Sequence, residues 1–264
     1  MIEFFTSISF ILGLIIGSFL NVVVLRFNTK KSLRGRSACM TCESKLRWYE
    51  LIPLFSFFTL MGRCRSCKTK ISIQYPLVEI ASGIVFSALF FKFQNLFFSN
   101  TLVFSVTYIY YAFMFSLLLV IATYDLKHKI IPDKLSFIFG ILAFIGLFLF
   151  NTSNSFIFYP HIPSILEFLS GVLVALPFAL LWLVSRGAWM GLGDPKLILG
   201  LGWLSGLGVA LSGIVVAFWS GAIVGIFLII LKKGYGMKSE IPFAPYLVLG
   251  AFLAFIFDLH LFGI

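Results

Sequence analysis

Long apolar stretches alternate with short polar segments along most of this chain. A helix of about 20 apolar residues is long enough to cross the hydrocarbon core of a bilayer, which is about 30 Å thick. The pattern therefore predicts an all-α polytopic membrane protein with about eight transmembrane helices. Their expected bounds are 4–25, 76–93, 101–124, 134–150, 165–184, 194–205, 209–231 and 242–262.

One longer polar segment separates the first two apolar stretches. It divides the chain into three expected parts. Residues 1–26 form the first transmembrane helix, residues 27–75 form a small cytoplasmic module, and residues 76–264 form the helical membrane core. All four cysteines of the protein lie in the module.

These cysteines form two Cys-x-x-Cys pairs, Cys39 with Cys42 and Cys64 with Cys67, and 21 residues separate the pairs. Such pairs place four thiolates tetrahedrally around a zinc ion. Disulfide bonds are the alternative, but a basic segment is expected on the cytoplasmic side, where thiols stay reduced. Because four cysteines leave no ligand position open, we predict a structural zinc ion that stabilises a module with little core of its own.

Composition and charge place the chain in the membrane, because 60% of its 264 residues are hydrophobic and 11% are charged. If the N-terminus lies outside, the predicted inside segments hold 19 of the 20 Lys and Arg residues, and Lys92 is the exception. Basic loops favour the cytoplasmic side, so this orientation is the one we predict. The net charge of +10 then indicates contact with anionic membrane lipids and not with nucleic acid.

Two aspartates stand at the ends of predicted spans. Asp125 follows the third span and Asp194 begins the sixth, so both carboxylates are expected at the cytoplasmic face of the membrane, where they could meet. An acidic side chain beside hydrocarbon is costly and suggests a function. Two close carboxylates tend to share one proton, so one can activate water while the other polarises a carbonyl. This division of roles is that of aspartic proteolysis.

Each aspartate also has a simpler interpretation. Asp194 precedes Pro195 and could be a helix N-cap, and Asp125 could form an ordinary surface pair with Lys127 and His128. Gly191 and Gly193 favour a substrate-lining turn at Asp194, because glycine permits positive φ and close backbone approach. Asp133, after Pro132, is expected to be a simple cap of the next helix.

Further motifs run through the chain in a fixed order around Asp125. They are GSFLNVV at 17–23, the two cysteine pairs, ELIP at 50–53, GRCRSC at 62–67, YPLVE at 75–79, IPD at 131–133, GLGDPKL at 191–197 and PFAPY at 242–246. Together they resemble the bacterial type IV prepilin peptidases, and the resemblance spans essentially the whole chain.

The resemblance implies a membrane aspartic endopeptidase of the Gly-x-Gly-Asp type in the bacterial inner membrane. It would remove the basic leader of type IV prepilins or pseudopilins at the cytoplasmic face, with Asp125 and Asp194 as the catalytic pair and with Gly191 and Gly193 in the active-site loop.

Many bacterial members of this family also methylate the new N-terminus with S-adenosylmethionine, and the cysteine-bearing first loop looks like that bifunctional type. Glu79 is the candidate residue for the methyl-donor region, or else a helix-start charge stabilised by the helix dipole. Two features leave methylation open. The chain carries ELIP where many members have Asp-Asn-Ile-Pro, and it contains no Gly-x-Gly-x-x-Gly motif after a strand.

Three other classes of protein remain in comparison. An ion-coupled transporter would use the membrane aspartates for flux, and an inactive zinc-stabilised membrane scaffold would tolerate their loss. A presenilin-like intramembrane protease shares the Gly-x-Gly-Asp chemistry. The cysteine module and the ELIP segment favour the prepilin peptidases over it.

Overall fold

A computed structural model describes residues 1–29, 32, 35–151, 156–231 and 241–263 of the chain. Over these residues the protein is helical, with isolated β-bridges and no longer strand, so the all-α prediction is confirmed. The chain forms two compact units, Met1–Gln94 and Asn95–Ile264. Six of the Lys and Arg residues on which the predicted orientation depends lie outside the described residues, namely Lys30, Lys31, Arg34, Lys232, Lys233 and Lys238.

The first unit pairs two long helices, α1 (Ile2–Arg26) and α3 (Gln74–Ser99). The last five residues of α3 extend beyond this unit, which ends at Gln94. Small residues let the two helices approach closely, since a Cβ added at Gly17 would lie 2.7 Å from the Cα of Glu79. The buried Asn21 side chain donates a hydrogen bond of 3.1 Å to the carbonyl oxygen of Tyr75 and so links α1 to the start of α3. The polar segment between them contains the 3-10 helix η1 (Trp48–Leu51) and the short helix α2 (Phe55–Thr59).

The second unit is a bundle of five helices, named α4 to α8. Their bounds are α4 (Thr101–His128), α5 (Asp133–Gly146), α6 (Ile165–Ser185), α7 (Gly193–Leu231) and α8 (Ala244–Ile256). Side chains fix two of their starts. Asn100 accepts a hydrogen bond from the N–H of Val103 at the start of α4, and Ser164 and Glu167 form a reciprocal capping box at the start of α6.

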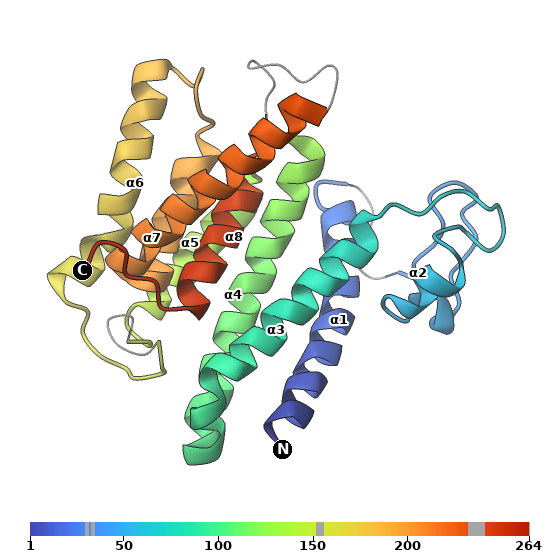
Figure 1. The fold of residues 1–264 in the computed structure, drawn as a ribbon, viewed down its shortest axis with the longest axis horizontal. Helices are drawn as coiled ribbons and strands as arrows, with labels where there is room; N and C mark the ends of the chain where they lie inside the picture. Colours follow the sequence, from blue (N-terminus) through green and yellow to red (C-terminus); the bar gives the residue numbers. More distant parts are fainter. Residues whose placement is uncertain (30–31, 33–34, 152–155, 232–240, 264) are drawn as a thin grey trace. The chain divides into compact units, whose positions relative to one another are not determined.

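Helix α7 is broken at Gly206, where φ is 75° and ψ is 172°. Glycine reaches this backbone region without steric cost, whereas other residues do not. The break falls between the predicted spans 194–205 and 209–231, so the two predicted segments are the two halves of α7. Figure 1 shows α7 changing direction part-way along its length.

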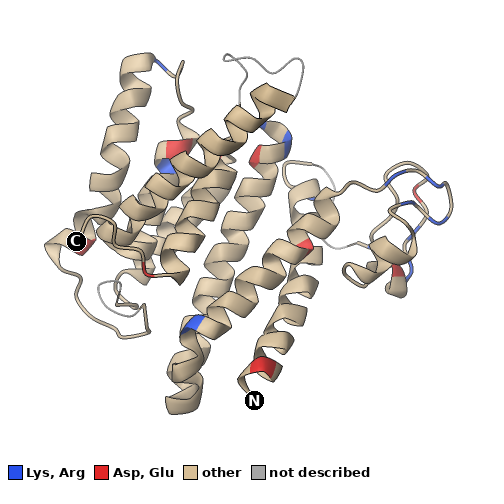
Figure 2. Cartoon of the chain, in the orientation of Figure 1, with Lys and Arg blue, Asp and Glu red and all other residues tan. Residues whose placement is uncertain are grey.

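Five of the helices, α1, α3, α4, α6 and α7, are long and apolar enough to cross a membrane. This agrees with a polytopic membrane protein, while the number of eight spans stays a prediction. Helices α5 and α8 have 14 and 13 residues, which gives each about 20 Å of length at about 1.5 Å per residue. Figure 2 shows many of the Lys and Arg residues on the polar segment of the first unit and near helix ends.

Candidate active site and cysteine cluster

Asp125 lies in the last turn of α4 and is buried, with 4% of its surface exposed. Its Oδ2 atom accepts a hydrogen bond of 3.2 Å from the backbone N–H of Ala244, the first residue of α8. Lys127 and His128 are exposed, and the ring of His128 lies 4.4 Å from the ring of Tyr124 in a tilted arrangement. The burial of Asp125 therefore argues against the interpretation as an ordinary surface ion pair.

Asp194 is the second residue of α7 and is buried, with 9% of its surface exposed. Its backbone N–H donates to the carbonyl oxygen of Gly191 over 3.3 Å, which closes the turn that leads into the helix. Since α7 begins at Gly193, Asp194 lies inside the first helical turn, whereas the alternative interpretation as an N-cap would place it before the helix.

The fold brings these two carboxylates together. Helix α4 packs against α8 and α8 packs against α7. The C-terminal end of α4 and the N-terminal end of α7 lie at the same end of the second unit (Figure 1). Asp125 and Asp194 are near enough to interact electrostatically. Two buried carboxylates that interact in this way are an arrangement suited to acid–base chemistry.

The loop before Asp194 is held against the turn that follows α4. A Cβ added at Gly193 would lie 2.7 Å from the Cβ of Ile131, so this position has no room for a side chain. At Gly191 the nearest atom to an added Cβ is the Oδ2 of Asp194, at 3.9 Å. Neither glycine has a positive φ, so close packing and not backbone freedom explains Gly193.

An ion pair that sequence reasoning missed joins the same two segments. The Nζ atom of Lys196 lies 2.6 Å from Oδ1 of Asp133. Asp133 is the first residue of α5 and Pro132 is its N-cap, so the expectation that Asp133 is a simple cap is wrong. The signal in the sequence was a lysine, Lys196, two residues after Asp194, but no pattern in the sequence indicated which residue it would pair with.

The four cysteines of the first unit also come together, and their sulfur atoms all lie within 4.8 Å of one another. All four are free thiols in the structure, so the alternative of disulfide bonds is not what the fold adopts. Their ligand chemistry and closed arrangement fit a single metal ion with four thiolate ligands, such as zinc.

The two cysteine pairs are built as two matching turns. In each turn the backbone N–H of the first cysteine donates a hydrogen bond to the backbone carbonyl oxygen five residues later. Cys39 donates to Ser44 over 3.0 Å, and Cys64 donates to Thr69 over 2.8 Å. In each turn the residue after the second cysteine has a positive φ, 55° at Glu43 and 62° at Lys68. This duplicated geometry aims both sulfur pairs at one point.

At two of the four cysteines, a hydrogen bond with a neighbouring hydroxyl group favours the thiolate form. The hydroxyl of Ser44, 3.1 Å from the sulfur, lowers the pKa of the Cys42 thiol, and the hydroxyl of Thr69, 3.2 Å away, lowers the pKa of the Cys67 thiol. A lower pKa increases the thiolate fraction, and the thiolate is the form that binds metals.

Comparison with known proteins gives two family matches that follow one another along the chain. The bacterial peptidase A24 N-terminal domain matches residues 11–93, and the type IV leader peptidase family matches residues 112–230. A prepilin leader peptidase/N-methyltransferase of Xanthomonas campestris is 30% identical over 280 residues, which cover 92% of this chain and 88% of the relative. The chain belongs to the type IV leader peptidase family.

Other relatives carry the same name. The protein of Myxococcus xanthus is 35% identical over 246 residues, covering 89% of this chain and 67% of the relative, and that of Bacillus subtilis is 29% identical over 253 residues, covering 95% and 94%. No solved structure matches the chain. These relatives give no support to the transporter interpretation.

Two motifs that carried the family resemblance acquire contacts in the structure. The PFAPY segment supplies the N–H of Ala244 that binds Asp125, a contact between residues 119 positions apart. Glu79 of the YPLVE segment is 6% exposed, and its Oε2 atom accepts a hydrogen bond of 2.9 Å from the N–H of Leu54. Glu79 lies beyond the first turn of α3, so its interpretation as a helix-start charge is wrong.

Proposed function

We propose that this member of the type IV leader peptidase family removes the leader peptide of type IV prepilins or pseudopilins and methylates the new N-terminus. The names of its relatives, which cover most of the chain, support both activities. The observation that carries the peptidase activity is the meeting of two buried carboxylates, Asp125 and Asp194, from different helices.

In the proposed reaction the two aspartates divide the roles of an aspartic endopeptidase. The ionised carboxylate takes a proton from a water molecule, whose oxygen attacks the scissile carbonyl carbon, while the protonated carboxyl group gives its proton to the carbonyl oxygen. The tetrahedral intermediate then collapses, the C–N bond breaks, and the leaving amine takes up a proton. Gly191 and Gly193 belong to the loop that positions Asp194.

A methyl-transfer step would follow cleavage. S-adenosylmethionine, when bound, supplies a methyl group to the lone pair of the new N-terminal amine, the electrons of the broken C–S bond stay on sulfur, and the amine releases a proton. The chain's own part is to bind the donor beside a neutral amine. Glu79 is the residue we assign to the donor region, and its buried carboxylate is compatible with a cationic ligand.

The proposed setting is the bacterial inner membrane, with the N-terminus outside and the active site at the cytoplasmic face. Residues 1–26 would anchor the chain, residues 27–75 would form a cytoplasmic module with zinc bound to Cys39, Cys42, Cys64 and Cys67, and residues 76–264 would form the membrane peptidase core. The basic residues would contact anionic lipids, and no nucleic acid takes part. A prepilin has a basic leader before an apolar helix, so its cleavage site would lie at this interface.

The test of the catalytic pair uses purified protein in detergent and a prepilin substrate. General acid–base groups contribute about 10²–10⁴-fold to rates, so Asp125→Asn and Asp194→Asn should each lower the cleavage rate by about that factor. Asp258→Asn, the same change in the C-terminal segment, should cleave like the wild type.

Cleavage at the wild-type rate by either variant would eliminate the pair. The melting temperature and the metal content of each variant are measured in parallel, because a variant that lost activity by unfolding would change both. A variant that is folded, metal-loaded and inactive supports the proposal.

A further inference from the structure

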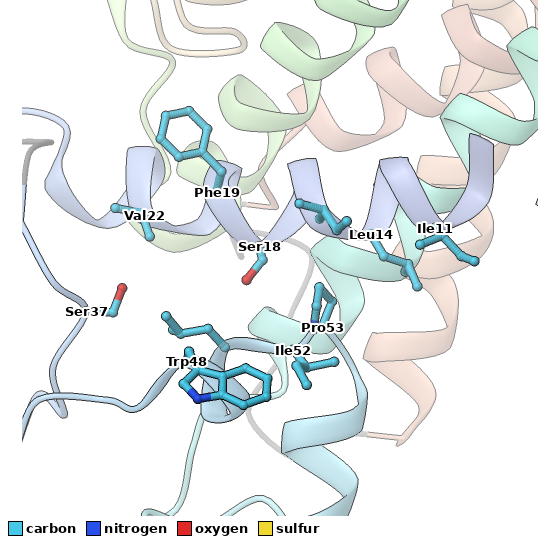
Figure 3. A pocket seen from close by; sticks show the side chains of 11 residues that line it. Ile11, Leu14, Ser18, Phe19, Val22, Ser37, Trp48, Ile52 and Pro53 are labelled. Atoms are coloured by element: carbon cyan, nitrogen blue, oxygen red, sulfur yellow. The ribbon is translucent and has the colours of Figure 1, made fainter. Parts of the chain in front are cut away.

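A pocket of about 550 Å³ lies within the first unit, between α1 and the polar segment that follows it (Figure 3). Its walls include Leu14, Ser18 and Val22 of α1 and, opposite, Trp48, Ile52 and Pro53. Small-molecule sites have volumes of about 300–1,000 Å³ and combine apolar walls with a few placed polar groups. This pocket has that size and that character.

The polar group behind the pocket wall is the buried carboxylate of Glu79. It forms a hydrogen bond with the side chain of Ser18, which lines the pocket, and it accepts the N–H of Leu54, the residue after Pro53. The carboxyl group of Glu79 is therefore held immediately behind Ser18 and next to the end of the wall at Pro53. The hydroxyl of Ser18 is the part of this network that reaches the pocket itself (Figure 3).

The backbone is strained at Leu54, directly after the wall residue Pro53. Leu54 has φ 58° and ψ −50°, and the N–H of Phe55 donates to the carbonyl oxygen of Pro53 over 2.6 Å, which makes a γ-turn with a positive φ at its centre. This turn is rare and costly for a residue with a branched side chain. The hydrogen bond from Leu54 to Glu79 fixes the turn, and backbone strain of this kind gathers at ligand sites.

The wall opposite α1 carries an aromatic ring. Trp48 begins η1 and is 76% exposed, so one face of its indole is available to a planar ligand. Aromatic side chains bind nucleobases by stacking. The pocket thus offers a stacking surface, an apolar wall and, behind that wall, a buried carboxyl group.

We infer that this pocket, here called the Trp48 pocket, is the methyl-donor site and binds S-adenosylmethionine. The inference rests on the proposed methylation. The donor combines an adenine ring, which matches the exposed indole, with a sulfonium cation, which matches the charge of Glu79 behind Ser18. Other small ligands have one of these features, but the pairing of a base with a permanent positive charge is the chemistry that all three parts of the site recognise together.

The experiment measures equilibrium binding of radiolabelled S-adenosylmethionine to the full-length protein in detergent, with S-adenosylhomocysteine as the comparison ligand. The two ligands differ by one methyl group and its positive charge, so their affinity ratio reports the charge behind the wall. In Glu79→Gln the amide oxygen can still accept the N–H of Leu54 while the charge is lost. We expect this variant to bind S-adenosylmethionine about tenfold more weakly and S-adenosylhomocysteine almost unchanged.

Trp48→Ala tests the stacking surface and should weaken both ligands by about 5–150-fold, the range found for base stacking. Two matched controls should bind both ligands like the wild type. Glu3→Gln makes the same change at the exposed start of α1, and Trp219→Ala removes a tryptophan of α7 that is 67% exposed.

Wild-type affinity for S-adenosylmethionine in both Glu79→Gln and Trp48→Ala would overturn the inference. It would also be overturned if the wild type cleaved and methylated prepilin but had the same ratio of affinities for S-adenosylmethionine and S-adenosylhomocysteine as Glu79→Gln. Failure of the proposed function looks different, because the wild type would then bind the donor in the Trp48 pocket without cleaving or methylating prepilin. Leader cleavage by each variant is measured alongside and shows whether it is folded.

Discussion

At the scale of single residues, Gly193 has the most restrictive surroundings in the active-site loop. Its Cβ position lies 2.7 Å from the Cβ of Ile131, an atom close to the backbone that has little freedom to move away. We expect Gly193→Ala to displace the loop that carries Asp194. Since a displacement of about 1 Å in an active site can cost about 10²-fold in rate, leader cleavage should fall by a factor of that order.

The control for this change is Gly140→Ala, because nothing lies within 4 Å of a Cβ added at Gly140 in α5. A second variant tests the cause directly. Combining Gly193→Ala with Ile131→Gly removes the opposing Cβ, so it should recover part of the lost activity. If Gly193→Ala alone cleaves prepilin as fast as Gly140→Ala, close packing against Ile131 does not position the loop.

At the scale of helices, the ion pair of Lys196 and Asp133 ties the first turn of α7 to the first turn of α5. Its side chains are 43% and 76% exposed, so its contribution to stability is small, about 0.2–1 kcal/mol. Its effect should appear in the placement of Asp194. We expect Lys196→Met to lower the rate of leader cleavage by up to about fivefold, with less effect at high salt.

A double-mutant cycle separates this pairing from other effects of the lysine. Lys196→Met and Asp133→Asn should be non-additive, so the double variant should be no slower than the slower single variant. Lys134→Met removes the neighbouring exposed lysine and serves as the matched control. Additive losses in the double variant would show that the two residues act independently.

The sequence predicted the position of the helices better than their ends. Apolar residues continue past the last helical residue of α5, so the predicted span 134–150 extends beyond the observed end at Gly146. The same is true of α8, which ends at Ile256 and not at 262. Hydropathy measures the environment of a residue and not its backbone conformation, so turns made of apolar residues look like helix.

The candidate sites show the same division between local and distant information. The cysteine cluster could be predicted because each Cys-x-x-Cys pair forms its own turn, with hydrogen bonds spanning a few residues. The meeting of Asp125 and Asp194 could be predicted because the predicted topology places the end of one helix and the start of the other on the same side of the membrane. The hydrogen bond from Ala244 to Asp125 and the pairing of Lys196 with Asp133 could not be predicted, because they depend on how the helices pack.

At the scale of the whole molecule, the predicted topology places the loop before α6 outside and the loop after it inside. Arg186, which follows α6, then lies on the cytoplasmic side. Alkaline phosphatase is active outside the cytoplasm, so a fusion after residue 163 should be active and a fusion after Arg186 inactive. A cytoplasmic reporter at the same two sites should give the opposite pattern. Equal phosphatase activity at both positions would contradict a membrane crossing by α6.

The cysteine cluster is also connected to the Trp48 pocket within the first unit. Arg65, between the cysteines of the second pair, lies over the ring of Tyr49 at 5.7 Å and forms a hydrogen bond with its hydroxyl. The same guanidinium is 4.0 Å from the carboxylate of Glu50. Tyr49 and Glu50 follow Trp48 in η1, so the turn that holds two sulfur atoms also orients the helix that carries the indole ring.

Loss of the metal should therefore affect methyl transfer more than cleavage. Structural zinc contributes about 10–16 kcal/mol to the folding of small zinc modules, so a module without it should lose its turns and release η1. We expect the double variant Cys39→Ser/Cys64→Ser to lack stoichiometric zinc by elemental analysis, to bind S-adenosylmethionine at least about tenfold more weakly, and to leave a mature N-terminus that mass spectrometry finds unmethylated. Leader cleavage should decline less, because Asp125 and Asp194 both lie in the second unit.

Ser66→Ala, within the second cysteine pair, should retain the zinc and both activities. Full methylation by the metal-free double variant would show that the cluster does not support the pocket, because the chain of contacts through Arg65 predicts that the two are lost together.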